Sequence, residues 1–271
     1  MLKKTIKRVM GLFIRPKIVK ASIFYSQPDK RLAGKRIIVT GGTGGLGEAM
    51  ARRFVAEGAD VLITGRNEEK LAKISQETGC RALPLDMTMP ETFEPFVSKA
   101  VALLGGIDCL VNNAGISLHE AFDKVTVEGF DRQISTNLRG PFFLTQHVLS
   151  HMTAHGVKGQ VLFVSSETGE TADIRPYGMT KAAINSLVKG LAYLYLKEEI
   201  RINAIAPGVT ASGMTGIGEE NLYCSYNPNK RAYLPDEMAE VATFLLSDAS
   251  GCISGQIVTC NNGKTINARW K

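Results

Sequence analysis

A regular alternation of short apolar runs and longer amphipathic stretches begins at Arg36 and continues almost to the end of the chain. Each short run is largely apolar throughout, which is typical of strands that are buried on both faces of a parallel sheet. The expected strands are residues 36–40, 60–64, 81–85, 107–111, 160–165, 201–205 and 256–260. The expected helices between them are residues 45–57, 67–78, 91–104, 128–154, 177–198 and 235–247. Because strands and helices alternate, the pattern predicts a doubly wound α/β fold, with a parallel seven-stranded sheet, helices on both faces and right-handed crossovers.

The 271 residues divide into two parts of different charge. Residues 1–31 contain nine Lys or Arg and one acid, so they carry a net charge of +8, whereas the remaining 240 residues carry −2. No linker rich in Pro, Gly or Ser interrupts residues 33–271, which we expect to form a single domain preceded by a basic extension, residues 1–32. Because the positive charge is confined to the extension, we expect no binding of nucleic acid by the domain.

The extension is amphipathic over residues 1–20. Read as a helix, it has an apolar face made of Leu2, Ile6, Val9 and Phe13 and a basic face made of Lys4, Arg8 and Arg15. Such a helix suits an anionic membrane surface. The alternatives are a tail that docks on its own protein or stays disordered, and a mitochondrial transit peptide. Because the chain lacks both the apolar run of a signal peptide and a stretch of about 18 apolar residues, we expect a cytoplasmic protein, with peripheral membrane contact through residues 1–20 as one option.

Cysteine and histidine spacing argues against metal sites. The five cysteines form no Cys-x-x-Cys pair and are expected to be free thiols in a reducing compartment; they are Cys80, Cys109, Cys224, Cys252 and Cys260. Three histidines recur at every fourth residue of one expected helix, at His147, His151 and His155. No acidic or Cys partner lies near them in the sequence, so we expect no metal site.

A glycine-rich turn follows the first expected strand and leads into the first expected helix. Gly41, Gly45 and Gly47 would let the backbone turn tightly, approach a pyrophosphate closely and pack the helix on the sheet. The helix N-terminus would then present free N–H groups and a partial positive charge to the phosphates. The spacing is Gly-x-x-x-Gly-x-Gly, and its position predicts a dinucleotide site on a Rossmann-like sheet.

The end of the second strand favours NADP(H) over NAD(H). Enzymes selective for NAD carry an acid there that binds the ribose 2′-hydroxyl. Here Thr64 and Gly65 are followed by Arg66, whose guanidinium is suited to a 2′-phosphate. NAD(H) remains an alternative, since Arg66 can also be read as a solvated residue at a helix start.

In order along the chain, these and later motifs resemble the short-chain dehydrogenase/reductase family, in its compact single-domain branch and in particular its 3-oxoacyl-(acyl carrier protein) reductase-like ketoreductases, over about residues 33–263. The Asn-Asn-Ala-Gly motif at residues 112–115 follows the fourth strand, Asp86 follows the third, and residues 207–210 read Pro-Gly-Val-Thr after the sixth. The family's Tyr-x-x-x-Lys motif runs from Tyr177 to Lys181. The resemblance implies that residues 33–271 are a dinucleotide-binding catalytic domain.

The resemblance also implies the site residues. The catalytic set would be Asn137, Ser166, Tyr177 and Lys181. The cofactor would contact Gly41, Thr43, Gly45, Leu46, Gly47, Arg66, Asp86, Met87, Asn113, Ala114, Gly115, Tyr177, Lys181, Pro207, Gly208 and Thr210. Two departures stand out: Asn261-Asn262-Gly263 replaces the family's common Asp-Gly-Gly, and the interval of 11 residues from Ser166 to Tyr177 is short, which affects the expected shape of the substrate lip.

These residue types suit hydride transfer between a nicotinamide and a carbonyl or alcohol. Lys181 lies one helical turn beyond Tyr177, so its ammonium is expected to lower the pKa of the phenol and to bind the nicotinamide ribose. Ser166 would stabilise charge on the substrate oxygen, and Asn137 would hold a water that links Lys181 to solvent. The sequence therefore predicts an NAD(P)-dependent oxidoreductase that acts on CH–OH groups.

Other functions stay open. Within enzymes, a 3-oxoacyl thioester reductase is the main alternative, and residues 210–231, the expected substrate lid, would decide between them. A catalytically silent NADP-sensing protein and a membrane-attached scaffold are alternatives outside enzymes. The resemblance also implies a homodimer or homotetramer packed through the helices at 128–154 and 177–198.

Overall fold

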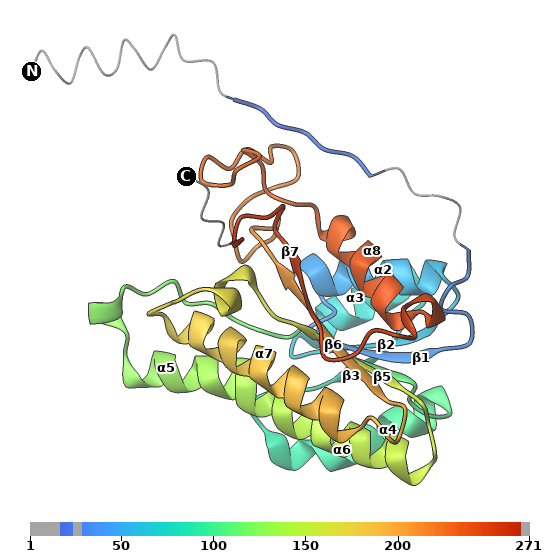
Figure 1. Ribbon diagram of the computed structural model, residues 1–271. Coiled ribbons are helices and arrows are strands. Elements are labelled where there is room, and N and C mark those ends of the chain that lie inside the picture. The colour runs from blue at the N-terminus through green and yellow to red at the C-terminus, as the bar shows by residue number, and fades with distance from the viewer. Residues whose placement is uncertain (1–16, 24–28, 267–271) are drawn as a thin grey trace, which may run out of the picture.

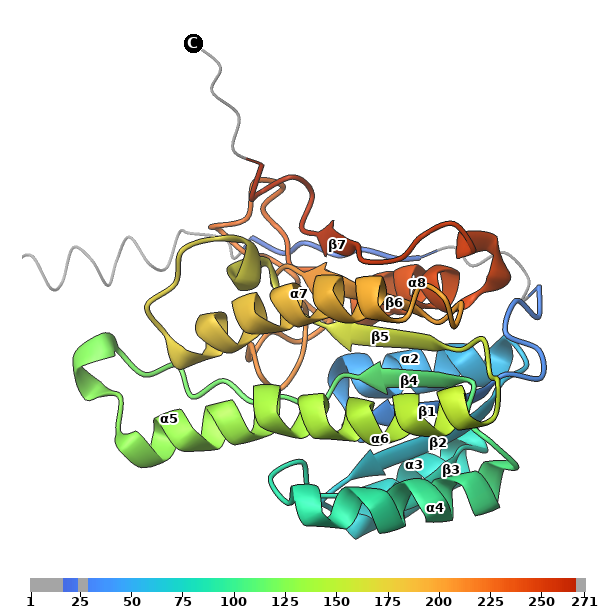
Figure 2. The same cartoon turned by 60° about the horizontal axis from the view of Figure 1, so that its bottom comes forward.

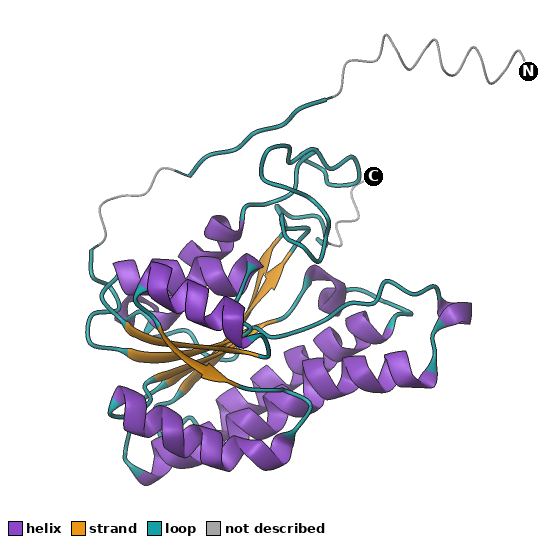
Figure 3. Cartoon of the chain, turned by 180° about the vertical axis from the view of Figure 1, so that it is seen from behind, coloured by secondary structure: helices purple, strands orange, loops and turns teal. Residues whose placement is uncertain are grey.

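Seven parallel strands form one sheet in the computed structural model, which describes residues 17–23 and 29–266. The order is β3-β2-β1-β4-β5-β6-β7. The strands are β1 (Arg36–Thr40), β2 (Asp60–Gly65), β3 (Arg81–Pro84), β4 (Cys109–Asn112), β5 (Gln160–Val164), β6 (Arg201–Pro207) and β7 (Ile257–Cys260). Every neighbouring pair is parallel, and β1 aligns Ile38 with Leu62 of β2 and Leu110 of β4. The predicted Rossmann-like doubly wound sheet is confirmed (Figure 3).

Helices cover both faces of the sheet, as Figures 1 and 2 show. The α-helices are α2 (Gly45–Ala56), α3 (Glu68–Thr78), α4 (Phe93–Leu104), α5 (Val127–Ile134), α6 (Gly140–Ala154), α7 (Pro176–Leu194) and α8 (Pro235–Leu246). Short 3-10 turns lie at Pro90–Thr92, Phe122–Lys124, Glu167–Glu170 and Asp248–Ser250. One apolar core joins α4, α6 and α7 to the sheet, and a second joins α2, α3 and α8 to its other face. Side chains of successive strand residues enter the two cores alternately, which explains the continuous apolar runs.

The sheet changes winding direction between β1 and β4. From β1 the chain proceeds outward through β2 and β3, then crosses back to β4 and proceeds the other way. Loops leaving the carboxyl ends of β1 and β4 therefore separate, and in open α/β sheets ligands bind at such a switch point. The fold thus fixes where a cofactor can bind.

The expected helix at residues 128–154 is interrupted. A π-helical turn at Ser135–Arg139 separates α5 from α6. It contains Asn137, whose side chain bonds the backbone of Ile116 in the loop after β4. The chain is nevertheless helical from Val127 to Ala154, as predicted, and only the π turn within the helix was not expected. Apolar periodicity does not report a single π turn, and such turns are frequent at functional sites.

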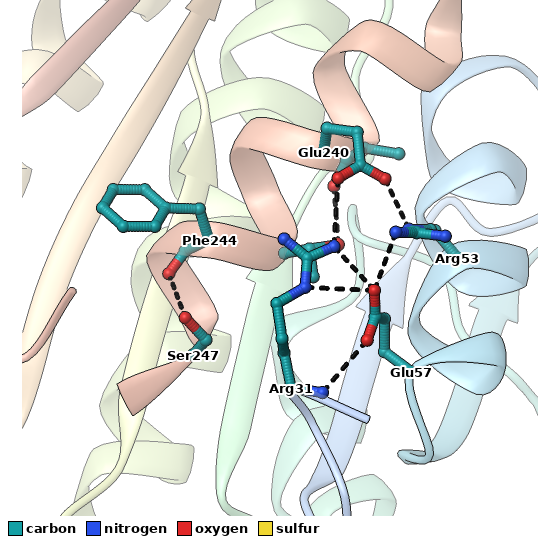
Figure 4. A network of polar contacts seen from close by, with 8 residues as sticks. Arg31, Arg53, Glu57, Glu240, Phe244 and Ser247 are labelled. Atoms are coloured by element: carbon teal, nitrogen blue, oxygen red, sulfur yellow. Dashed lines mark hydrogen bonds and ion pairs between the residues drawn. The ribbon is translucent and has the colours of Figure 1, made fainter. Parts of the chain in front are cut away.

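A buried ionic network attaches the segment before β1 to α2 and α8 (Figure 4). The Glu57 carboxylate, which is fully buried, contacts both Arg31 and Arg53 at 2.6 and 2.7 Å. Both arginines also contact Glu240 of α8. Burial by itself would raise the pKa of Glu57, but the hydrogen bonds and charge of Arg31, with the charge of Arg53, hold the pKa below its ordinary value. The network therefore favours an ionised Glu57 and fixes the chain as it enters the sheet.

The basic extension is described only in part. The predicted amphipathic pattern over residues 1–20 falls mainly on residues 1–16, which lie outside the described residues. None of the helices among residues 17–23 and 29–266 is long and apolar enough to cross a bilayer.

Candidate active site

A large cleft opens along the carboxyl ends of β1, β4, β5 and β6, with a volume of about 1490 Å³. That exceeds the roughly 300–1,000 Å³ of an ordinary ligand pocket, which suits a dinucleotide together with a second molecule. Of the residues predicted for cofactor or catalysis, Gly47 and Asn137 lie behind the cleft wall. The others line it: Gly41, Thr43, Gly45, Leu46, Arg66, Asp86, Met87, Asn113, Ala114, Gly115, Ser166, Tyr177, Lys181, Pro207, Gly208 and Thr210.

The glycine turn has the geometry that a phosphate cradle needs. Gly41 and Gly45 adopt φ values of 67° and 53°, which favour glycine. A Cβ on Gly47 would overlap the carbonyl oxygen of Gly41, so only glycine lets α2 start this close to the turn. The first turn of α2 begins at Gly45 and faces the cleft. These residues fit a bound pyrophosphate.

Asn113 and Thr40 hold that turn in place. The Asn113 Nδ2 atom donates to the carbonyl oxygens of Thr40 and Gly41 at 2.9 and 3.1 Å. The Thr40 hydroxyl in turn accepts from the backbone N–H groups of Asn113 and Ala114. The Asn-Asn-Ala-Gly motif therefore connects β4 to the glycine turn and presents Ala114 and Gly115 to the cleft.

Basic side chains gather where β2 ends. Arg66 and Lys70 are both exposed and both line the cleft close to Thr43. No acid of this region lines the cleft, since Glu68 and Glu69 are directed elsewhere in the part of the chain described. Asp86, whose Oδ1 accepts from the N–H and hydroxyl of Thr88, lies further along the same wall. The sequence had indicated Arg66 but not Lys70, which lies in the first turn of α3 and lines the same cleft.

The two serines after β5 have different surroundings. The Ser165 hydroxyl donates to Asn185 Oδ1 at 2.5 Å and so joins β5 to α7. The Ser166 hydroxyl accepts from the N–H and hydroxyl of Thr168 and interacts with the phenol of Tyr177. Only Ser166 is therefore brought together with Tyr177.

Asn137 joins the loop after β4 to α7 at the back of the site. Its side chain accepts from the N–H of Ile116 and donates to the carbonyl oxygen of the same residue, at 2.9 and 2.8 Å. It also donates to the Thr180 hydroxyl on α7. Asn137 Oδ1 and Lys181 Nζ both lie close to Gly115, where a Cβ would stand 3.4 and 3.7 Å from them. The side chain is thus engaged with protein groups, and it lies next to the lysine.

Tyr177 and Lys181 share one face of α7, and the Lys181 Nζ atom lies 5.5 Å from the centre of the Tyr177 ring. Lys181 is almost fully buried and donates to the carbonyl oxygen of Val164 at 2.7 Å. Burial lowers the pKa of Lys181 to about 8. The cation is therefore easily discharged near neutral pH.

The expected direction of the Tyr177 pKa shift is wrong in this structure. Burial raises the pKa of Tyr177, while the Ser166 hydroxyl and the charge of Arg175 oppose that rise. Lys181 is not among the groups that lower the pKa of Tyr177. Burial lowers the pKa of Lys181 to about 8, so the lysine is already uncharged at the pH where the phenol loses its proton. Arg175, held by Asp173 in a bidentate pair with contacts of 2.6 to 3.2 Å, is the cation that acts on the phenol. The sequence motif does not include it.

The loop after β6 completes the wall. A Cβ on Gly208 would stand 2.9 Å from the Tyr233 ring and from Asn261, so the close approach requires glycine. The Thr210 hydroxyl donates to the carbonyl oxygen of Gly208. Pro207, Gly208 and Thr210 therefore present a rigid edge to the cleft.

Part of residues 210–231, the segment predicted to form a lid and called the lid below, lines the cleft. Residues 212–216 and Tyr226 line the cleft, while Cys224 is buried in the lid's own small apolar core. His119 Nε2 lies 3.2 Å from the carbonyl oxygen of Met214, so the loop after β4 and the lid meet across the opening.

Residues 17–23 of the N-terminal extension lie against this lid. The N–H of Leu222 donates to the carbonyl oxygen of Val19 at 2.9 Å. The Asn221 side chain accepts from Val19 N–H and donates to the Lys17 carbonyl oxygen, and it also accepts from the Tyr223 N–H. Ala21 and Ile23 pack against the apolar core of the lid. Residues 17–23 (the blue segment near the top of Figure 1) therefore act as a strap across the lid.

Removing the strap's main clasp should loosen the lid. We expect Asn221→Ala to raise the substrate KM about three- to tenfold while the KM for the cofactor stays within twofold, because the lost hydrogen bonds hold only the lid. Hydrogen exchange should become faster in both residues 17–23 and 211–234. Glu219→Ala, at an exposed lid position, is the control. Equal effects of the two variants would contradict the clasp.

No group of three or more His, Cys, Asp or Glu in the described residues could hold a metal ion. His151 and His155 stack with ring centres 4.3 Å apart on α6. All five cysteines are free thiols.

The chain is similar to known reductases and dehydrogenases, one of which has been solved with a bound dinucleotide. A family model described as enoyl-(acyl carrier protein) reductase matches residues 41–265. Glucose 1-dehydrogenase of Gluconobacter oxydans is 31% identical over 249 residues, covering 87% of this chain and 94% of that protein. A short-chain type dehydrogenase/reductase from Mycobacterium marinum has a TM-score of 0.81 at 28% identity, covering 89% of this chain and 100% of that one. A 3-ketoacyl-(acyl-carrier-protein) reductase from Brucella melitensis, complexed with NADH, has a TM-score of 0.80 at 30% identity, covering 87% and 100%.

Proposed function

The chain belongs to the short-chain dehydrogenase/reductase family, and from this premise we propose that it transfers a hydride between NADP(H) and a small carbonyl or alcohol substrate. The proposed catalytic residues are Asn137, Ser166, Tyr177 and Lys181. The observation that supports the proposal is the meeting of Ser166 with Tyr177, and of Tyr177 with Lys181, inside the cleft that the glycine turn enters. A surface Tyr-x-x-x-Lys pair would have neither the serine nor the burial.

Each proposed group has a distinct task. When bound, the nicotinamide supplies the hydride to the carbonyl carbon or takes it from the alcohol carbon. In reduction, Tyr177 donates its proton to the substrate oxygen, and its raised pKa keeps the phenol protonated at neutral pH. Ser166 donates a hydrogen bond to the same oxygen as charge develops there. Lys181, with a pKa of about 8, can return the proton to Tyr177. Asn137 keeps the loop of Gly115 beside the lysine.

Turnover tests this function directly. Oxidation of NADPH should be seen with a panel of ketones and aldehydes, and reduction of NADP⁺ with the matching alcohols. A protein that binds NADPH but reacts with no member of the panel would favour the cofactor-sensing alternative. The relative from Brucella melitensis named a 3-ketoacyl-(acyl-carrier-protein) reductase keeps the acyl thioester in the panel.

The basic groups at the end of β2 support NADP(H) as the preferred cofactor. Arg66 and Lys70 line the cleft, so both are available to a 2′-phosphate. We expect the double variant Arg66→Ala and Lys70→Ala to raise the KM for NADPH about 10- to 100-fold, because charge-assisted hydrogen bonds contribute about 1.5–3 kcal/mol. The KM for NADH should change less than threefold.

A control and an opposing outcome sharpen this prediction. The Lys73 side chain is on α3 with Lys70 and is 72% exposed. Lys73→Ala therefore removes a solvated cation and should leave the KM values for NADPH and NADH unchanged. If the double variant raised the KM for NADH as much as the KM for NADPH, or changed neither KM, the proposed preference for NADP(H) would be wrong. The relative complexed with NADH shows that members of this family also take NAD(H).

We further propose a homodimer or homotetramer that packs through α5, α6 and α7. These helices expose large apolar side chains, namely Phe130, Phe142, Phe143 and Met179. Light scattering after size-exclusion chromatography measures the oligomeric state. Cytoplasmic localisation, with membrane contact of residues 1–20, stays a proposal from the charge pattern, and binding of the full chain to anionic vesicles tests the contact. The single domain at 33–271 is likewise a proposal.

A further inference from the structure

A buried carboxylate stands directly beside the proposed catalytic serine. Glu167 follows Ser166 and is 8% exposed. Its Oε1 contacts Lys264 Nζ at 2.6 Å, and its Oε2 accepts from Asn261 Nδ2 at 3.1 Å. Glu167 and Lys264 both line the cleft. The mechanism proposed above uses neither of them.

The ion pair ties the loop after β7 to the end of β5. Asn261, which is 1% exposed, also donates to the Thr265 hydroxyl, so the whole loop is fastened around Glu167. Lys264 Nζ lies 5.3 Å from the centre of the Tyr226 ring in the lid. The ion pair of Glu167 and Lys264 therefore lies between the end of β5, the lid and the loop after β7.

Asn261 explains the departure from the family's Asp-Gly-Gly. An Asp at this position would place a second carboxylate about 3 Å from Glu167 in a buried setting, where like charges repel strongly. An Asn donates to Glu167 instead. The replacement of Asp by Asn261 is thus compatible with the buried Glu167 carboxylate, which an Asp would repel.

Further polar groups line the cleft near Glu167 in the sequence. Arg175 lines it, paired with Asp173, and the hydroxyls of Thr168 and Thr171 lie on the same stretch of chain after Ser166. Each ion pair is neutral as a unit, so the wall offers hydrogen-bond donors and acceptors without a net charge. An acyl chain bound here would strip water from both pairs and return no hydrogen bonds. A substrate carboxylate would meet Glu167.

We propose that the site takes neutral, polyhydroxylated carbonyl or alcohol compounds, of the sugar or polyol class, and that Glu167 and Lys264 bind hydroxyls next to the reacting carbon. A hydroxyl can donate to the Glu167 carboxylate and accept from the Lys264 ammonium, which neither an alkyl chain nor a carboxylate can do. This proposal rests on the proposed function of the same cleft, whose substrate class it names.

The test compares five-carbon alcohols that differ in their flanking hydroxyls. With NADP⁺ and the full chain, kcat/KM is measured for xylitol, ribitol and D-arabinitol against pentan-2-ol, and NADPH oxidation for an acetoacetyl thioester. The best pentitol should exceed pentan-2-ol at least about 100-fold, since hydrogen bonds to charged groups are strong. In Glu167→Gln and in Lys264→Met, this ratio should fall at least about tenfold. Lys264→Arg, which keeps the cation, should restore most of it.

Binding separates this proposal from the proposed function. Calorimetry on the NADP⁺ complex should show a pentitol binding at least tenfold tighter than pentan-2-ol, whether or not it reacts. Such binding with no turnover of any compound would support the substrate class and overturn the oxidoreductase activity. A higher kcat/KM for pentan-2-ol or for the thioester, or tighter binding of pentan-2-ol, would overturn the substrate class alone. Equal losses for pentitol and pentan-2-ol in Glu167→Gln would reduce Glu167 to a structural residue and also overturn the proposal.

Discussion

Tyr177→Phe is expected to lower kcat at least about 10³-fold for every carbonyl substrate, since general acid catalysis contributes about 10²–10⁴-fold. The phenol oxygen is the only atom removed, and Tyr177 alone combines a cleft position with contact to both Ser166 and Lys181 among the described tyrosines. The dissociation constant of NADPH should stay within about threefold, because the ring and the backbone of α7 remain. Stopped-flow reduction and fluorescence titration of NADPH measure the two quantities.

The pH profile gives a second readout of the same group. Because burial raises the pKa of Tyr177, the phenol itself stays protonated through neutral pH, and the rate of carbonyl reduction should begin to fall above about pH 8, where Lys181 loses the proton that it returns to Tyr177. Tyr193→Phe, on the same helix but 80% exposed, should change neither kcat nor the profile. A Tyr177→Phe enzyme that kept more than a tenth of its activity would remove Tyr177 from the mechanism.

The sheet and the cofactor half of the cleft could be predicted because they depend on local patterns. Strands such as β1 and β5 are buried on both faces, so each reads as an unbroken apolar run. The strand order places the carboxyl ends of β1 and β4 at a switch point, where ligands bind in such sheets. The glycine turn follows β1 directly, so its position in the sequence was enough to place it at this site. The fold and the location of the predicted cofactor residues therefore followed from short stretches of sequence.

The contacts around Ser166 and the lid in the substrate half could not be predicted, because they join distant residues. Glu167 and Lys264 are 97 positions apart, and Val19 and Asn221 are 202 apart. No periodicity relates such positions, so the ion pair and the strap emerge only when the chain is folded. The sequence marked Asn261 as a departure without its partner, which the fold supplies.

The pKa values of Tyr177 and Lys181 also could not be predicted from the sequence. The motif places Lys181 one turn from Tyr177, and that spacing suggested an ammonium that acidifies the phenol. Spacing does not report burial. In the fold Lys181 is almost fully buried and Tyr177 is half-buried, so the pKa of Tyr177 rises and that of Lys181 falls. Desolvation outweighs the attraction between the two groups.

Lys181→Met should inactivate the enzyme and also stabilise it. The buried lysine has a pKa of about 8 against an ordinary value of 10.5, so keeping it charged below pH 8 costs about 3 kcal/mol of folding free energy. Methionine fills a similar volume without a charge, although the Val164 carbonyl oxygen loses its donor at a cost of about 1–2 kcal/mol. We expect a net gain of about 1–2 kcal/mol and a Tm higher by roughly 3–6 °C at pH 7. Activity should fall by about 10²–10⁴-fold, because the proton path to Tyr177 is lost.

The sign of this effect with pH distinguishes it from better packing. Wild type carries the full penalty below pH 8 and loses it as pH rises from 8 to 10.5, since the folded lysine has already given up the proton that the unfolded chain still holds. The stability advantage of Lys181→Met should therefore be largest near pH 7 and reverse by about pH 10.5, where the variant should be less stable than wild type by about 1 kcal/mol, because only the loss of the hydrogen bond to Val164 remains. Lys189→Met, at an exposed position of α7, should show no such dependence. Urea unfolding of the protein without cofactor at pH 7, 9 and 10.5 measures it, and a variant less stable than wild type at pH 7 would show that Lys181 is held charged by a partner rather than strained by burial.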